Sequence, residues 1–311
     1  MNRYGKDGGT VIELAVPLEF SFTECLIFLE RSDQELLHQT RQGYLYKLIK
    51  IGQELVLLKI GSTGTSLQIE FPIKTPSKDA QATAIKYVKE WFDLDKNLRA
   101  FYETASKDKM LKKVAEEYAG LRVVGIPDLF EAITWAIMGQ QINLKFAYTL
   151  KQRFVQEYGE HVDYDGQSFW LFPEYETIAD LSVEHLRKLQ FTTRKAEYII
   201  GIAHSMRSGS LSKNKLIQME SIEKIHRGLT SLRGIGDWTA DYVLMKCFRH
   251  QDAFPIADVG LHLAMQKQLG LDRKPAIEEI KDRSKDWIGW RGYATFYLWR
   301  SLYDESNKSR L

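Results

Sequence analysis

The feature that most restricts the fold is a pair of glycines, Gly234 and Gly236, that lie between two stretches of helical periodicity. The flanking stretches run from Ile222 to Leu232 and from Trp238 to Phe248. Two glycines separated by one apolar residue allow a tight hairpin whose backbone can approach another molecule closely. Their amides would lie at the start of the second helix, where unpaired N–H groups and the helix dipole attract an anion. The segment therefore predicts a phosphate-binding hairpin anchored by Ile235, although a plain helix–turn–helix corner fits the glycines equally well.

Helical patterns continue through most of the second part of the chain. Pro127 and Asp128 open a helix that Gly139 ends, and Asn143 is positioned to cap the next helix. The loop between these two helices, residues 139–142, is short and polar. A succession of helices with short loops predicts an all-α domain, and we expect it to cover residues 108–311.

The first part of the chain has a different pattern. Three runs rich in β-forming residues cover residues 44–51, 55–60 and 67–71, and glycine-containing turns separate them. A short helix is expected just before them, over residues 23–29. We therefore predict an α+β protein, with a mixed α/β domain of helices and a small antiparallel sheet over residues 1–107. A polar stretch near residues 95–110 marks the boundary with the helical domain.

Charge and composition exclude several classes of protein. The net charge is only +2, but residues 190–311 contain 20 Lys and Arg against 14 Asp and Glu, and the remainder contains 23 against 27. A basic C-terminal part suits a polyanionic partner, as it also suits an ordinary solvated surface. No apolar run is long enough to span a membrane, and the first ten residues lack a signal-peptide core. We expect a cytoplasmic protein in which Cys25 and Cys247 are ordinary buried thiols.

The hairpin segment and its sequel resemble a known family of enzymes. Residues 232–240 (Leu-Arg-Gly-Ile-Gly-Asp-Trp-Thr-Ala) are followed at 254–258 by Phe-Pro-Ile-Ala-Asp. This arrangement is similar to the helix–hairpin–helix DNA glycosylase superfamily, which is named for the hairpin and for a Gly/Pro-rich loop that ends in aspartate. Within it the chain resembles 3-methyladenine DNA glycosylase II from about Pro127 to Arg300, including residues 137–141 (Ile-Met-Gly-Gln-Gln) and 290–294 (Trp-Arg-Gly-Tyr-Ala).

The resemblance implies that Asp258 is the catalytic residue. Cleavage of an N-glycosidic bond gives the sugar oxocarbenium character, and a nearby carboxylate stabilises it or helps a water molecule to attack it. Both roles remain open for Asp258. Without the hairpin, an aspartate at this place would be interpreted as an ordinary helix N-cap.

Trp238 indicates the subtype of the reaction. Members of the superfamily that also cut the strand carry a lysine at the matching position, and this lysine forms a Schiff base with the sugar. Tryptophan has no amine, so the resemblance implies removal of the base alone. Lys246, two turns further along, is expected to be an exposed helical lysine. Two cysteines cannot ligate the four-cysteine cluster of the iron–sulfur branch, and no cofactor is expected.

The aromatic residues indicate the substrate. A purine alkylated at N3 or N7 is a cation, and aromatic faces attract cations. By likeness to the subfamily, the base pocket is lined by Trp238, Tyr242, Trp299 and Phe28. Trp238 and Tyr242 are four residues apart and would share a helix face, which lets them form one wall. Core packing is the alternative for each ring, and Phe28 is the least specific of the four.

The resemblance also implies how DNA is held and how the base is flipped out of the duplex. The hairpin residues Gly234, Ile235, Gly236 and Thr239 would hold phosphates, together with a monovalent cation bound to the hairpin backbone. Flipping needs a wedge that fills the gap in the duplex. The leucine expected for this role aligns with Gln141, so either Gln141 or Ile142 is the wedge. Lys195 is a candidate phosphate contact or a solvated helical lysine.

These observations favour one function over two alternatives. We expect a monomeric DNA N-glycosylase that removes alkylated purines from duplex DNA and leaves an abasic site. An 8-oxoguanine glycosylase with strand-cleaving activity also has an α/β amino-terminal domain, but Trp238 stands where its lysine belongs. A noncatalytic DNA-binding module with the same hairpin is disfavoured by Asp258, Trp238 and Trp299.

Overall fold

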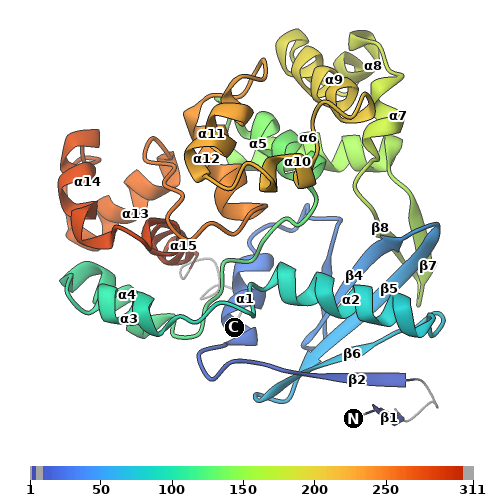
Figure 1. The fold of residues 1–311 in the computed structure, drawn as a ribbon, viewed down its shortest axis with the longest axis horizontal. Helices are drawn as coiled ribbons and strands as arrows, with labels where there is room; N and C mark the ends of the chain where they lie inside the picture. Colours follow the sequence, from blue (N-terminus) through green and yellow to red (C-terminus); the bar gives the residue numbers. More distant parts are fainter. Residues whose placement is uncertain (1, 5–9, 304–311) are drawn as a thin grey trace.

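The computed structural model describes residues 2–4 and 10–303, and its first part is built around one antiparallel sheet (Figure 1). Leu45 pairs with Ile60, and Ile60 pairs with Ile69, so three fully buried side chains lie in register on the core face. The six strands lie in the order β1 (Asn2–Tyr4), β2 (Thr10–Ala15), β6 (Ser66–Glu70), β5 (Glu54–Ser62), β4 (Tyr44–Ile51) and β3 (Gln39–Arg41). The predicted sheet is confirmed.

Two helices accompany this sheet. The short helix α1 (Phe22–Leu29) begins after Ser21, whose hydroxyl oxygen accepts a hydrogen bond from the Glu24 amide at 3.2 Å. The longer helix α2 (Lys78–Trp91) contacts β4 and lies across one face of the sheet in Figure 1. Its buried residues recur at helical spacing, which buries one stripe against the sheet and leaves the other side in solvent. The predicted short helix is confirmed, whereas α2 was not expected.

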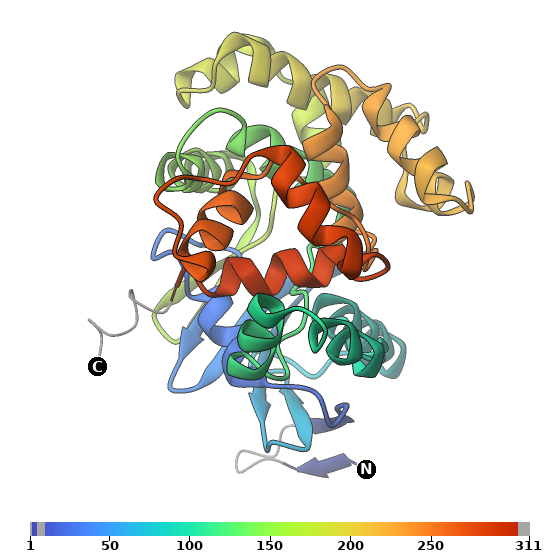
Figure 2. The same ribbon diagram turned by 90° about the vertical axis from the view of Figure 1, so that its left-hand side faces the viewer.

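The second part is mainly helical, as predicted, and its last helix, in dark red, lies near the middle of the view in Figure 2. The predicted caps are confirmed: the side chains of Asp128 and Asn143 accept hydrogen bonds from the amides of Glu131 and Phe146 at 2.7 and 2.8 Å. The helices are α3 (Arg99–Ala105), α4 (Lys109–Glu117), α5 (Leu129–Gly139), α6 (Leu144–Tyr158), α7 (Tyr175–Ala179), α8 (Val183–Lys188), α9 (Thr193–Arg207), α10 (Lys213–Ile217), α11 (Ile222–Thr230), α12 (Asp237–Lys246), α13 (Val259–Leu269), α14 (Ile277–Arg283), the 3-10 helix η1 (Ser284–Trp287) and α15 (Arg291–Arg300).

A β-hairpin interrupts the helical part, which is a correction to the expected all-α domain. Strands β7 (His161–Tyr164) and β8 (Gln167–Trp170) are joined by Asp165 and Gly166, with φ angles of 50° and 72°. An Asp-Gly pair favours this two-residue turn because both positions need positive φ. Phe169 is 1% exposed and packs with Leu48 and Leu57, so the hairpin rests on the amino-terminal sheet.

One hydrophobic core runs through both parts of the chain. It contains residues of the sheet, of α1 and α2 and of the helices around α15. Helix α4 contacts α15, and α3 contacts η1, so the segments on both sides of residue 107 pack against C-terminal helices. The division at residue 107 therefore stays a prediction. Cys25 and Cys247 are both free and fully buried, as expected, and no helix within the described ranges has the length and apolar character needed to cross a membrane.

Candidate active site

The predicted hairpin joins α11 and α12. Ile235 is 5% exposed and packs in the core, as expected. Gly234 has φ +94°, and a Cβ atom there would lie 2.3 Å from Cγ of Tyr198, so only glycine fits. Gly236 is exposed, and a Cβ atom there would meet nothing within 4 Å. The main-chain hydrogen bonds of the described residues leave the amides of Gly234 and Gly236 unused, so both are available to an anion at the start of α12.

The loop between α5 and α6 braces this hairpin. The amide nitrogen Nε2 of Gln140 donates to the main-chain oxygen of Gly234 at 2.9 Å and lies 3.1 Å from Oγ1 of Thr239. Thr239 as a whole residue is only 1% exposed, so neither its side chain nor its main chain lies at the surface, and its contact with DNA stays a prediction. Gln141 is exposed with φ 55°, whereas Ile142 packs against the core. Of the two wedge candidates, only Gln141 projects away from the core.

The Asp258 carboxylate accepts three hydrogen bonds. As the N-cap of α13 it accepts from the amide of Leu261 at 2.8 Å through Oδ1. The indole Nε1 of Trp238 donates to Oδ2 at 3.0 Å, and the indole Nε1 of Trp299 donates to Oδ1 at 2.7 Å. The helix-cap interpretation and the catalytic interpretation of Asp258 are therefore compatible. The side chain is a cap whose remaining lone pairs hold two aromatic rings in place.

Gly260 makes room for this arrangement. A Cβ atom at Gly260 would lie 2.9 Å from Oδ1 of Asp258 and 3.2 Å from Nε1 of Trp299. Any side chain there would push the indole away from the carboxylate, because such contacts are shorter than real Cβ atoms normally make. This requirement was not anticipated from the sequence, because Asp258 caps α13 whereas Trp299 lies on α15, far along the chain.

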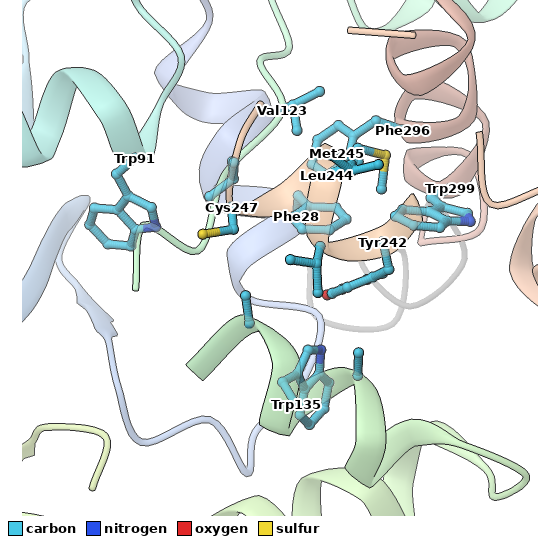
Figure 3. Close-up of a cluster of buried hydrophobic side chains, with 14 of the residues drawn as sticks. Phe28, Trp91, Val123, Trp135, Tyr242, Leu244, Met245, Cys247, Phe296 and Trp299 are labelled. Atoms are coloured by element: carbon cyan, nitrogen blue, oxygen red, sulfur yellow. The ribbon is translucent and has the colours of Figure 1, made fainter. Parts of the chain in front are cut away.

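The four predicted pocket aromatics lie in one region, as Figure 3 shows for Phe28, Tyr242 and Trp299. The ring centroids of Trp238 and Tyr242 are 5.7 Å apart, and those of Tyr242 and Trp299 are 6.2 Å apart, with the rings inclined by 32° and 36°. The three rings are thus tilted neighbours at distances typical of aromatic contacts, and Tyr242 and Trp299 are only 8% and 9% exposed. Phe28 is 4% exposed and lies 4.3 Å from Phe296 by ring centroids.

Arg31 is the residue of this region that the sequence did not indicate. Its guanidinium carbon lies 4.2 Å from the centroid of Phe28, so it covers one face of that ring. Its Nη1 donates to the main-chain oxygen of Phe28 at 2.9 Å. Arg31 follows Phe28 by three residues, which is a helical neighbour spacing, but α1 ends before it. The spacing alone therefore gave no sign of the contact.

Two lysines lie differently from the sequence expectations. Lys246 was expected to be exposed, and this is wrong: it is 3% exposed, donates to the main-chain oxygen of Val124 and lies 4.6 Å from the ring centroid of Phe296. Burial holds the pKa of Lys246 well below its usual value. Lys195 is 7% exposed, so a solvated lysine is also wrong there, and its Nζ donates to the main-chain oxygen of Met138 at 2.7 Å. Burial lowers the pKa of Lys195 as well.

The hairpin backbone offers main-chain oxygen atoms as ligands for the monovalent cation that the resemblance implies. The main-chain oxygens of Leu232 and Gly234 each accept one hydrogen bond, from the Ile235 amide at 3.1 Å and from Gln140 at 2.9 Å. Each carbonyl oxygen retains a second lone pair. These oxygens could hold such an ion, whose charge would help to hold a phosphate. The hairpin cation stays a prediction.

Comparison with known proteins gives two family matches. Residues 134–289 match the family described as HhH-GPD superfamily base excision DNA repair protein. Residues 18–133 match the family described as 8-oxoguanine DNA glycosylase, N-terminal domain. The boundary between the two matches falls inside α5, which agrees with a core shared by both parts of the chain.

Named relatives cover most of the chain. It is 43% identical over 297 residues to the DNA-3-methyladenine glycosylase of Bacillus subtilis, which covers 94% of this chain and 97% of that protein. It is 31% identical over 180 residues to DNA-3-methyladenine glycosylase 2 of Escherichia coli, which covers 58% of this chain and 60% of that protein.

Two solved structures share the fold. The 3-methyladenine DNA glycosylase from Archaeoglobus fulgidus gives a TM-score of 0.78 at 24% identity, over 95% of this chain and 98% of that chain. A Clostridium acetobutylicum 8-oxoguanine glycosylase/lyase bound to DNA gives a TM-score of 0.74 at 18% identity, over 99% of this chain and 98% of that chain. At these identities the structures establish the fold alone, whereas the family match and the Bacillus relative establish kinship. The chain belongs to the HhH-GPD superfamily of base excision DNA repair proteins.

Proposed function

We propose that the chain is a monofunctional DNA N-glycosylase, which hydrolytically removes alkylated purines of the 3-methyladenine type from duplex DNA and leaves an abasic site. The observation that carries the proposal is the Asp258 carboxylate, held by the indoles of Trp238 and Trp299 beside Tyr242. A carboxylate beside aromatic faces suits a cationic base that leaves an oxocarbenium-like sugar. The names of the Bacillus and Escherichia relatives support the same substrate class.

The reaction begins with DNA binding at the hairpin. The amides of Gly234 and Gly236 hold a phosphate, and the α5–α6 loop brings its tip to the duplex. We propose Gln141 as the wedge, because it is exposed while Ile142 packs against the core. The amide of Gln141 can hydrogen-bond to the orphaned partner base, which an apolar wedge cannot do.

The flipped base then stacks against Trp238, Tyr242 and Trp299. The negative charge of Asp258 stabilises the positive charge that develops on the sugar as the bond to the base lengthens. The same carboxylate oxygens can accept a proton from an attacking water molecule. Selectivity for alkylated purines follows largely from their weak glycosidic bond, since a stacking wall has few groups that distinguish one base from another.

Strand cleavage by an amine does not fit this site. Trp238 occupies the position of the lysine in the strand-cleaving members, and Lys246 is buried against the main chain of Val124. The match of residues 18–133 to the 8-oxoguanine glycosylase amino-terminal domain favours that activity as the second candidate. We also propose a monomer that acts in the cytoplasm, and on the nucleoid if the cell is bacterial.

One experiment separates the candidates. Duplexes that contain 7-methylguanine, 8-oxoguanine or only ordinary bases are incubated with the protein, and abasic sites are measured with and without borohydride. We expect base release from the methylated duplex, no covalent adduct, and strand breaks only after heat or alkali. A trapped adduct would assign a lyase, release from the 8-oxoguanine duplex alone would support the second candidate, and no release from any duplex would leave a noncatalytic DNA-binding module.

A further inference from the structure

A positively charged residue, Arg31, lies beside Phe28, one of the four aromatic residues that the sequence predicts for the base pocket. Its guanidinium carbon lies 4.2 Å from the ring centroid of Phe28 and 5.7 Å from that of Tyr148. Phe296 lies on Phe28 as well, at 4.3 Å between centroids, and in Figure 3 Phe28 lies between Phe296 and Tyr242. A base that entered this region would therefore meet a cation as well as aromatic rings.

No carboxylate among residues 2–4 and 10–303 forms a salt bridge with this cation, and Glu35 acts on it only at longer range. Arg31 forms no salt bridge there, and its guanidinium makes one hydrogen bond, to the main-chain oxygen of Phe28. Glu35 is the acidic residue with a buried side chain that lies nearest to Arg31 in the sequence. Its Oε2 forms a salt bridge with Nζ of Lys151 at 2.8 Å. Four of the five guanidinium N–H groups are thus left for other partners.

The rings of Phe28 and Tyr148 lie against the guanidinium of Arg31. Burial lowers the pKa of Arg31, whereas electrostatic interactions with Tyr148, Tyr303, Tyr242 and the Glu35 carboxylate raise it, and the net pKa lies above its ordinary value, so Arg31 stays charged. The hydroxyl of Tyr148 is buried and has no hydrogen-bond partner within the described part of the chain. An aromatic cage of this kind attracts cations, and here the protein supplies the cation itself.

This arrangement has a consequence for binding. An alkylated purine is attracted to aromatic faces because it is a cation, whereas a fixed positive charge nearby repels it. For two charges about 6 Å apart at an effective dielectric constant of about 20, the repulsion corresponds to about a hundredfold in affinity. A neutral base of the same shape escapes this repulsion, and its acceptor atoms can bind the unused N–H groups of Arg31.

Resting on the proposed function, we propose that Arg31 is a specificity-determining residue that weakens the binding of cationic bases relative to neutral bases of the same shape. Any flat base is attracted by the rings of Trp238, Tyr242 and Trp299. Arg31 then sets how much a positive charge on that base increases its affinity. The balance between the two sets the range of damaged bases that the protein accepts.

The test is a pair of duplexes that differ only in the charge of one base. One contains 2′-fluoro-7-methylguanosine and the other contains the 7-deaza analogue with the same methyl group. The fluorine destabilises the oxocarbenium-like transition state, so both bases stay attached while dissociation constants are measured at mildly acidic pH. Arg31→Met should raise the affinity for the cationic base relative to the neutral base by about tenfold or more, and Arg31→Lys should keep the ratio within about threefold of the unmodified protein.

The controls separate charge selectivity from folding and from DNA binding. A duplex with a tetrahydrofuran abasic analogue should bind Arg31→Met and the unmodified protein equally, and Arg273→Met removes the same charge from an exposed site that is paired with Glu279. A ratio that Arg31→Met leaves unchanged, with both analogues bound above undamaged DNA, would overturn the inference alone. If the unmodified protein bound neither analogue above undamaged DNA, the proposed function would be overturned and the inference with it.

Discussion

Replacing Asp258 with asparagine tests the chemistry and the packing of the site separately. The shape of the side chain hardly changes, but one carboxylate oxygen becomes an NH₂ group. If the asparagine oxygen takes the place of Oδ1, it keeps the bonds from Leu261 and Trp299. The NH₂ group then faces the Trp238 indole N–H, which bonds to Oδ2 in the native protein at 3.0 Å. Two donors oppose each other, and one charge-assisted hydrogen bond is lost.

The effect on stability is small. Asparagine caps a helix as well as aspartate does, so the contribution of the cap is retained. The lost bond to a charged group is worth about 1.5–3 kcal/mol. Trp238 is half-buried, and water can satisfy part of its N–H, so we expect a net loss near the lower limit, about 1–2 kcal/mol in the free energy of unfolding. Chemical denaturation followed by fluorescence would measure this loss.

The effect on catalysis is much larger. Removal of one group aimed at a developing charge costs about 10²–10³-fold in rate, and a full negative charge beside the sugar contributes more than one neutral donor. We expect Asp258→Asn to lower the single-turnover rate of base release by at least about 10³-fold, or about 4 kcal/mol of transition-state stabilisation. Binding to a duplex with an abasic analogue should be retained, because the hairpin does not depend on the carboxylate.

A double variant distinguishes the two effects. Trp238→Phe in the Asp258→Asn background removes the opposed donor and should recover part of the lost stability, while base release stays lost. Trp238→Phe alone should retain measurable release, since it keeps a stacking ring. If Asp258→Asn retained a near-normal single-turnover rate, Asp258 would be only a helix cap and the mechanism derived from it would be wrong.

Three further predictions follow from the described contacts. Gly236→Val should weaken DNA binding on all sequences alike, and it should change the free energy of unfolding by no more than about 0.5 kcal/mol, because a Cβ atom there meets no protein atom. Gly234→Val should destabilise the fold by several kcal/mol, because a Cβ atom there would overlap Tyr198. An equal loss of stability in both variants would refute this difference between the two glycines. Gln141→Ala should slow release of a damaged base more than Ile142→Ala does, whereas the latter should lower stability more, in paired kinetic and unfolding measurements. Lys246→Met should keep base release. Because burial lowers the folded-state pKa of Lys246, the unfolded chain binds more protons than the folded one, so the unmodified protein should gain stability relative to Lys246→Met as pH rises toward the ordinary lysine pKa. Curves of unfolding free energy against pH that ran parallel for the two proteins would contradict this.

Local patterns predicted the features that depend on neighbouring residues. Asp128, Asn143 and Asp258 each cap a helix through a bond to an amide three residues ahead, and such bonds depend little on the rest of the fold. Gly234 is required by a close approach to Tyr198, but its turn could be recognised from the glycine pair alone. The hairpin β7–β8 was missed, although Asp165-Gly166 between short runs of alternating residues is a recognisable signal.

Tertiary packing decided the features that the sequence did not reveal. Lys246 has the sequence context of an exposed lysine at a helix end, but α12 is buried on nearly all sides. Its spacing of four from Tyr242 and eight from Trp238 places it on the same helix face as the aromatic pair, which was a usable signal. The place of Arg31 depends on its contact with Tyr148 of α6, which is more than a hundred residues away in the chain, and no local pattern encodes it.

Helix α12 couples the parts of the site, and this coupling constrains how the reaction subtype can change. Its start carries the hairpin amides, and one residue inside it Trp238 reaches Asp258 with its indole N–H. A lysine at residue 238 would supply an amine to the sugar but would remove both a stacking ring and a hydrogen bond to the carboxylate. The ammonium would also pair with Asp258 and lose nucleophilicity unless it were deprotonated. We therefore expect a change from base removal to strand cleavage to require compensation around Asp258, because one side chain supplies a ring of the proposed base pocket and bonds to the carboxylate.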